Sequence, residues 1–172
     1  GLENDWGANI GSVLLKDYPM DIKNEAKAWA AAGSDARMSG CERPVVIVSG
    51  SGNQGMTASL PVIRYAKHLG VSQEKLYQAL LVSDLVTIHQ KTGIGRLSAY
   101  CGAVSAACGA GAAIAYLLGE KKSSEELYRQ VADTITNTIA TVGGMVCDGA
   151  KSSCAAKIAT AVEAGIFGYE MY

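Results

Sequence analysis

The chain has 172 residues, of which 49% are hydrophobic and 18% are charged, and its formal net charge is -1. These values are typical of one globular domain built around one hydrophobic core. A net charge so close to zero excludes the strong positive field that draws a protein to nucleic acid or to an anionic membrane surface. We therefore expect neither nucleic acid nor a membrane among its partners.

The first residues, from Gly1 to Trp6, include acidic side chains and no apolar run, which predicts a cytoplasmic protein without a signal peptide. No charged residue occurs between Leu97 and Gly119, although this stretch is long enough to cross a bilayer. Its side chains are mostly those of Ala, Gly, Ser and Cys, which contribute little free energy of transfer into lipid. We interpret the stretch as a central helix enclosed by other helices, because small side chains let neighbouring backbones approach closely.

Helix-forming residues dominate the chain between its glycine-rich turns. Ser72 is placed to cap the N-terminus of one helix, and Ser123 with Glu126 has the spacing of a capping box at the start of another. The predicted helices cover residues 21–38, 56–69, 72–90, 95–118, a segment from 123 onward, and 148–164, where Asp148 is the expected N-cap. The predicted fold class is all-α: a compact multi-helix domain of roughly seven helices around a central Ala/Gly-rich helix, with at most one short strand.

A glycine-rich segment follows the one candidate strand, which runs from Pro44 to Ser49. Residues Gly50 to Gly55 match the Gly-x-Gly-x-x-Gly fingerprint of dinucleotide-binding proteins, ahead of a helix predicted to begin near Met56. A nucleotide-binding unit of that kind needs a second parallel strand after the helix, but the chain becomes helical again after Gly70. A nicotinamide-binding oxidoreductase is therefore a minor alternative. The backbone N–H groups of the loop suit a carboxylate or a phosphate, and a tight turn without a ligand is the plain alternative.

Four of the five cysteines lie in Gly- and Ala-rich segments: Cys101, Cys108, Cys147 and Cys154. Thiols in a chain without a secretory signal favour a metal site or catalysis over disulfides. Thiolates select zinc or iron–sulfur clusters, but the sequence has no closely spaced Cys pair of the zinc type, and neither histidine lies in a zinc motif. Three thiolates without a fourth suit a 4Fe-4S cluster that keeps one iron open. The alternative is that the thiols only fill the core as small hydrophobes.

Three separated segments resemble one known family. They are Ser49 to Pro61, Lys91 to Cys108 and Gly144 to Cys154, and in this order they are similar to the bacterial L-cysteine desulfidase family. That family is related to the alpha-chain domain of iron–sulfur L-serine dehydratases. The resemblance extends over most of the chain.

The resemblance implies that Cys101, Cys147 and Cys154 hold a 4Fe-4S cluster. The sequence departs from the serine dehydratase pattern in two places, since the last two cysteines are closer together and no Glu follows Cys101 closely. Cys108, seven residues after Cys101 and on the same helix face, therefore stays open as a substitute ligand. Cys41 lies outside all three segments.

The implied reaction is a β-elimination in which the open iron acts as a Lewis acid. L-Cysteine would give pyruvate, ammonia and sulfide, and L-serine would give pyruvate and ammonia, without pyridoxal phosphate. Ser51, Asn53 and Gln54 are the expected substrate-binding residues. No general base is identified, and we interpret Lys91 as a solvated surface charge. The non-enzymatic alternative is a helical domain with structural thiols.

Members of the resembled family are longer than this chain. We therefore expect residues 1–172 to be a cluster-binding domain of a longer protein. Its expected partners are a small L-amino-acid substrate and the missing N-terminal portion of the same protein, which would complete the substrate site. A homo-oligomer is also compatible with this expectation.

Overall fold

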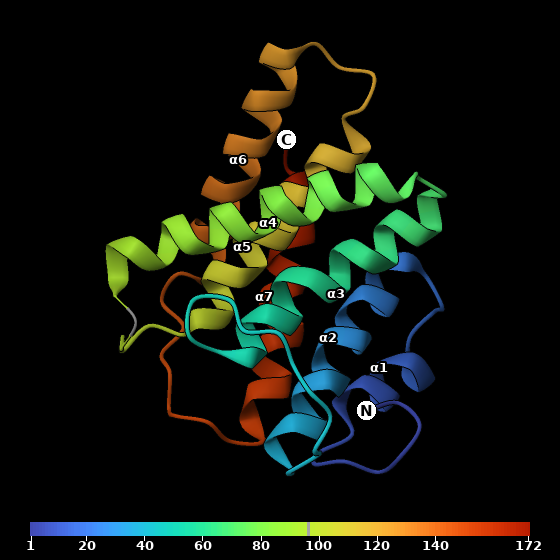
Figure 1. Cartoon of the computed structure of the whole chain (residues 1–172), viewed down its shortest axis with the longest axis vertical. Helices are drawn as coiled ribbons and strands as arrows, with labels where there is room; N and C mark the ends of the chain where they lie inside the picture. The colour runs from blue at the N-terminus through green and yellow to red at the C-terminus, as the bar shows by residue number, and fades with distance from the viewer. Residues whose placement is uncertain (96) are drawn as a thin grey trace.

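The computed structural model describes residues 1–95 and 97–172, and these residues form seven helices. They pack into one bundle (Figure 1). The predicted all-α class is confirmed. The helices are α1 (Ile10–Asp17), α2 (Ile22–Met38), α3 (Gly52–Leu69), α4 (Gln73–Ile94), α5 (Gly102–Leu118), α6 (Ser124–Val142) and α7 (Ser153–Glu170).

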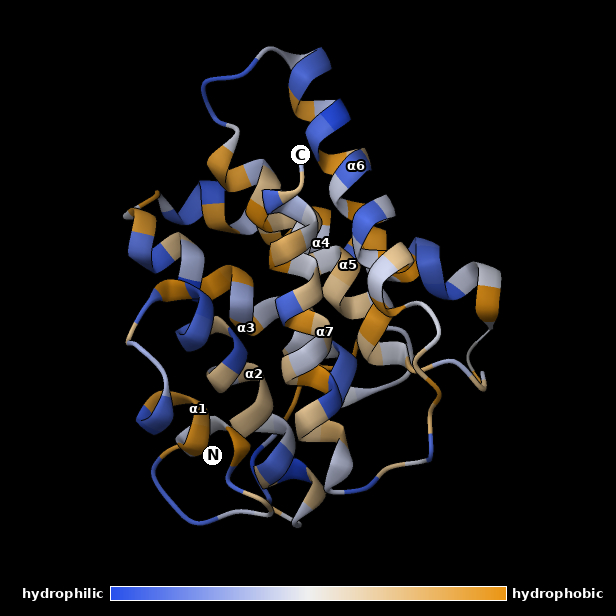
Figure 2. Ribbon diagram, turned by 180° about the vertical axis from the view of Figure 1, so that it is seen from behind, coloured by the Kyte–Doolittle hydropathy of each residue, from blue (hydrophilic) through white to orange (hydrophobic). Residues whose placement is uncertain are grey.

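Helix α5 is the centre of the bundle, as the small-residue stretch predicts. It packs against α3, α4, α6 and α7, and nearly all of its residues are buried. Figure 1 shows α4 crossing in front of α5, and Figure 2, seen from behind, shows α7 on the opposite side. The helix is therefore enclosed by its neighbours, and its lack of charge reflects burial in protein. Among the described residues, no helix is both long and apolar enough to span a membrane.

Glycines on α5 bring its backbone into direct contact with two neighbouring helices. A Cβ added at Gly111 would lie 2.7 Å from the carbonyl oxygen of Gly165 on α7. A Cβ added at Gly109 would lie 2.3 Å from the carbonyl oxygen of Ser83 on α4. Real Cβ atoms do not approach other atoms so closely, so these positions require glycine to keep the helices at this separation.

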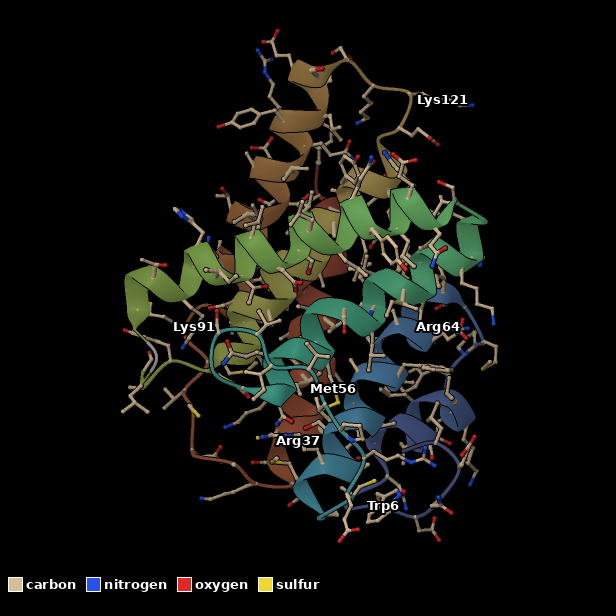
Figure 3. The ribbon with its side chains drawn as sticks, in the orientation of Figure 1. Trp6, Arg37, Met56, Arg64, Lys91 and Lys121 are labelled. Atoms are coloured by element: carbon tan, nitrogen blue, oxygen red, sulfur yellow. The ribbon has the colours of Figure 1, made fainter. Side chains whose placement is uncertain are left out.

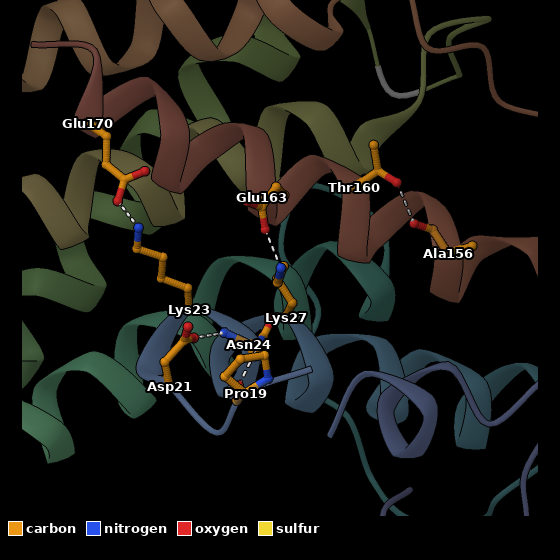
Figure 4. Close-up of polar contacts among 9 residues, drawn as sticks. All are labelled: Pro19, Asp21, Lys23, Asn24, Lys27, Ala156, Thr160, Glu163 and Glu170. Carbon is orange, nitrogen blue, oxygen red and sulfur yellow. Dashed lines mark hydrogen bonds and ion pairs between the residues drawn. The ribbon is translucent and has the colours of Figure 1, made fainter. Parts of the chain in front are cut away.

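Polar contacts near the surface join the outer helices. Lys23 and Lys27 of α2 form ion pairs with Glu170 and Glu163 of α7 (Figure 4). Ion pairs that remain partly exposed to solvent contribute little to stability, so they orient α2 on α7 more than they hold it there. The capping box predicted for α6 is confirmed by reciprocal hydrogen bonds, and Figure 2 shows hydrophilic residues along the outward side of this helix.

Helix α4 has an unusual distribution of side chains. Its buried residues are small or polar, namely Ala79, Ser83, Thr87 and Lys91. Its exposed residues include large apolar side chains at helical spacing: Tyr77, Leu81, Leu85 and Ile88. The small inner face is what allows α4 to lie directly on α5.

Several predicted boundaries are wrong. The segment from Pro44 to Ser49 is not a strand, because the described residues offer it no neighbouring strand, and only an isolated bridge joins Val48 to Ser51. The helix expected near Met56 begins at Gly52, so most of the glycine-rich segment belongs to its first turn. The helix expected from residue 95 begins at Gly102, while Arg96 lies outside the described residues.

Two further differences concern the ends of the chain. The last helix begins at Ser153, so Asp148 is not its N-cap. Helix α1 is absent from the sequence prediction because no side-chain cap marks its start. A tertiary contact replaces that cap, since the backbone N–H groups of Ala8 and Ile10 donate to the buried carboxylate of Asp35 on α2.

The contact between α5 and α7 can be tested by substitution. Gly111→Ala is expected to lower the free energy of unfolding by about 1–3 kcal/mol, because its Cβ meets backbone that cannot rotate away. The matched control is Gly93→Ala on α4, where an added Cβ meets nothing within 4 Å; this change is expected to be neutral or to stabilise by up to about 1 kcal/mol. Urea denaturation followed by circular dichroism measures both. Equal stability of the two variants would contradict a constraint at Gly111.

Candidate functional site

A pocket of about 310 Å³ lies where α3, α5 and α7 begin. It brings together all six predicted site residues, which come from three separate parts of the chain. Figure 3 labels two more residues of its wall, Arg37 on α2 and Lys91 on α4. The six predicted residues on the pocket wall are Ser51, Asn53, Gln54, Cys101, Cys147 and Cys154.

Backbone pairing places Cys101 beside Cys147. The N–H of Cys101 donates to the carbonyl of Met145 at 2.9 Å, and the N–H of Cys147 donates to the carbonyl of Ala99 at 2.7 Å. These bonds flank an isolated antiparallel bridge between Tyr100 and Val146. Two cysteines that are 46 positions apart in the sequence are therefore held at one end of α5 by main-chain bonds, independently of their side chains.

Cys154 reaches the pocket from the first turn of α7, where it is the second residue of the helix. The loop before it is held by Asp148, whose carboxylate accepts a hydrogen bond from Lys157 Nζ at 2.6 Å. This bond lowers the pKa of Asp148 and raises that of Lys157. Lys157 also donates to the carbonyl of Val146, which ties the loop to α7. Asp148 therefore anchors the loop that carries Cys147.

The thiols differ in their surroundings. Burial raises the pKa of the Cys101 thiol, and the neighbouring thiol groups of Cys147 and Cys154 raise it further. Cys101 is buried, Cys154 is half-buried and Cys147 is exposed. The three thiols thus line one cavity but differ in their exposure to solvent.

Cys108 does not share this pocket. It is fully buried in α5 and lines a second cavity of about 440 Å³, on the side of α5 that faces α4 and the end of α6. Burial raises its pKa to about 12. Of the two cysteines that spacing left as alternatives, Cys101 lines the pocket of Cys147 and Cys154, and Cys108 does not. Cys41 lines a separate cavity near the end of α2.

The donor set on the pocket wall consists of three thiols. Among the described residues, no group of three His, Cys, Asp or Glu side chains is arranged to hold one metal ion. A cluster differs in this respect, because each thiolate binds a different iron and the sulfur atoms stand around a shared volume. Three thiols on the wall of one cavity are consistent with that requirement.

The three helices that begin at the pocket lack side-chain caps. Asp21, Ser72 and Ser123 cap α2, α4 and α6 with hydrogen bonds. Among the described residues, no side chain caps the first turn of α3, α5 or α7. The N–H groups of a first turn have no acceptor within their own helix and carry partial positive charge. The pocket is therefore bordered by three uncapped helix N-termini.

The glycine-rich segment serves packing. A Cβ at Gly55 would lie 2.0 Å from the carbonyl oxygen of Val46, and a Cβ at Gly52 would lie 2.8 Å from Nε of Arg37. The glycines therefore admit a neighbouring chain segment and an arginine to the first turn of α3. Because the described residues contain no parallel sheet beside this turn, the resemblance to a dinucleotide fingerprint has no structural counterpart.

Two residues of the pocket have roles that the sequence does not reveal. Lys91 is only 5% exposed, so its interpretation as a solvated surface charge is wrong. Arg37 Nη1 donates to Oδ1 of Asn53 at 3.1 Å, across the gap between α2 and α3. Arg37 has no sequence signal, because only the packing of α2 on α3 brings it to the pocket.

The fold and the pocket define an all-helical domain with a thiol-lined site at converging helix N-termini. Residues 2–172 match the family described as serine dehydratase alpha chain, and the chain belongs to this family. The resemblance found in the sequence is confirmed at this level. No solved structure matches the chain.

The chain is also similar to proteins named as UPF0597 proteins. It is 64% identical over 172 residues to one from Desulfitobacterium hafniense, covering 100% of this chain and 39% of that protein. It is 63% identical over 166 residues to one from Lachnoclostridium phytofermentans, covering 96% and 38%. A relative from Fusobacterium nucleatum is 50% identical over 167 residues, covering 94% and 38%. The chain thus spans about two fifths of the length of these relatives.

Thiol reactivity provides a test of the site geometry. In metal-free protein treated with iodoacetamide at mildly alkaline pH, Cys147 is expected to react first and Cys108 to stay unmodified until the protein unfolds, because only accessible thiolate reacts. Peptide mass spectrometry measures each site, and a denatured sample in which all five cysteines react is the control. Alkylation of Cys108 as fast as that of Cys147 would contradict the assigned positions.

Proposed function

We propose that this domain is the cluster-binding part of an iron–sulfur-dependent lyase that acts on L-cysteine or L-serine by β-elimination. The observation that carries the proposal is the convergence of Cys101, Cys147 and Cys154 on one pocket with the glycine-rich first turn of α3. Membership of the serine dehydratase alpha chain family supports the same reaction class.

In this proposal Cys101, Cys147 and Cys154 hold a 4Fe-4S cluster. When bound, such a cluster supplies an iron with an open coordination position, which serves as a Lewis acid for a hydroxyl or thiol leaving group. Cys101 stands at the N-terminus of α5 and Cys154 in the first turn of α7. The partial positive charge of these helix ends stabilises the negative charge of the thiolates.

The opposite wall of the pocket carries polar groups that suit a small amino acid. Ser51, Asn53 and Gln54 are the proposed substrate contacts, and they are held in place by the start of α3. Gly102 leaves room for one of them, since a Cβ there would lie 2.6 Å from the amide of Gln54. The pocket volume is suited to a ligand of a few heavy atoms beside the thiols.

We also propose that the rest of a longer protein completes the site. The relatives are more than twice as long as the region that this chain matches, and Cys147 is exposed at the pocket rim. The isolated domain is therefore expected to bind the cluster with little turnover. A cytoplasmic location fits the proposal, because the cysteines are free thiols and reduced thiols persist in that compartment.

Anaerobic reconstitution with iron and sulfide tests the proposal. The wild-type domain is expected to gain the broad visible absorbance of an iron–sulfur cluster, with stoichiometric iron and sulfide, because three thiolates face one cavity. The variants Cys101→Ala, Cys147→Ala and Cys154→Ala are each expected to lose most of this absorbance.

Cys41→Ala and Cys108→Ala are the matched controls, since these cysteines line other cavities. Both are expected to reconstitute like the wild type. If the wild-type domain assembles no cluster, or if Cys147→Ala assembles it as the wild type does, the proposal is contradicted and the thiols are structural side chains.

A further inference from the structure

The pocket has the electrostatic character of an anion site. Its lining includes two cationic side chains, Arg37 and Lys91, and no Asp or Glu. The uncapped first turn of α3 adds N–H donors to the same wall. Positive charge that is partly removed from water requires a negative partner, and the described residues of the wall supply none.

Arg37 is positioned for a planar anion. It is half-buried, and no carboxylate within the described ranges pairs with it at ion-pair distance. One of its five donors is used in the bond to Asn53 Oδ1, and this bond orients the guanidinium across the start of α3. Gly52 leaves the space in which the side chain lies. A guanidinium presents pairs of parallel donors that match the two oxygens of a carboxylate.

Gln54 provides a hydrogen-bond acceptor, in contrast to the donors of Arg37. Gln54 is only 8% exposed, and it lines the pocket. Its Oε1 is buried and has no hydrogen-bond partner among the described residues. A buried acceptor without a donor is destabilising by about 1–3 kcal/mol, so a donor group on a bound ligand would stabilise this side chain. An ammonium group is the donor that complements it.

We propose that Arg37, with the N-terminus of α3, binds the α-carboxylate of the substrate and that Gln54 Oε1 accepts a hydrogen bond from its α-ammonium group. The pocket then selects a free α-amino acid by both backbone ends and directs the side chain towards the thiols on the other wall. This assignment rests on the proposed lyase function for the identity of the ligand. The charge pattern that motivates it depends only on the pocket.

The test uses three small probes that separate the two ends of the ligand. L-Serine carries both charged groups, ethanolamine lacks the carboxylate, and 3-hydroxypropionate lacks the ammonium group. Binding to the metal-free chain is measured by the shifts of backbone amide resonances during titration. The wild-type chain is expected to bind L-serine at least about tenfold more tightly than either analogue, since each hydrogen bond to a charged group contributes on that order.

The variants are expected to give opposite patterns. Arg37→Met is expected to weaken the binding of L-serine and of 3-hydroxypropionate by about tenfold and to leave the affinity for ethanolamine unchanged. Gln54→Leu is expected to weaken the binding of L-serine and of ethanolamine and to leave the affinity for 3-hydroxypropionate unchanged. Arg43→Met is the matched control, because Arg43 lines a different cavity and is expected to leave all three affinities unchanged. Helical content by circular dichroism confirms that each variant is folded.

Cluster reconstitution separates this inference from the proposed function. Arg37→Met is expected to assemble the cluster as the wild type does, because it leaves the thiols in place. A wild-type domain that assembles the cluster but does not distinguish L-serine from the two analogues overturns the inference alone. A domain that assembles no cluster but binds L-serine through Arg37 overturns the proposed function alone. The inference is also overturned if Arg37→Met weakens the binding of all three probes to the same extent, or if the wild type does not bind L-serine.

Discussion

Backbone contact between α5 and α7 is the constraint on which the rest of the structure depends. At Gly111 and Gly165 the two helices meet without intervening side chains, so their relative position is fixed by main-chain atoms. Cys101 lies at the start of one helix and Cys154 in the first turn of the other. The packing of the bundle core thus fixes the positions from which two of the three thiols reach the pocket.

Electrostatics explains why such a site stands at helix ends. Three helix N-termini and two cations border a pocket whose lining has no carboxylate. In the proposed function, the thiolates and the substrate carboxylate would all be negative, and this arrangement would stabilise each of them. The same lining holds Gln54 Oε1 as an unpaired acceptor, which gives the site a place for positive charge on the substrate. This charge pattern supports the proposed binding of a zwitterion beside the cluster thiolates.

The sequence predicts the features whose causes are local. The caps at Ser72 and Ser123 and the small residues of α5 are recognised because their physical effects act within one helix. The cysteines that line the pocket are singled out through the resemblance of whole segments. Arg37 and the burial of Lys91 escape prediction, because they depend on how α2 and α4 pack against other helices. The start of α3 at Gly52 is missed for a related reason. Glycines in a sequence indicate a loop, but here they lie in the first turn of the helix, where they allow close packing with neighbouring segments.

The missing caps of α3, α5 and α7 have a consequence for folding. An N-cap side chain contributes about 1 kcal/mol to the stability of a helix. Helices α2, α4 and α6 have this contribution, whereas α3, α5 and α7, which begin at the pocket, do not. A ligand that accepts hydrogen bonds from N–H groups in these first turns would take the place of an N-cap side chain. A ligand that bound at these helix ends would therefore stabilise the folded domain relative to the unfolded chain.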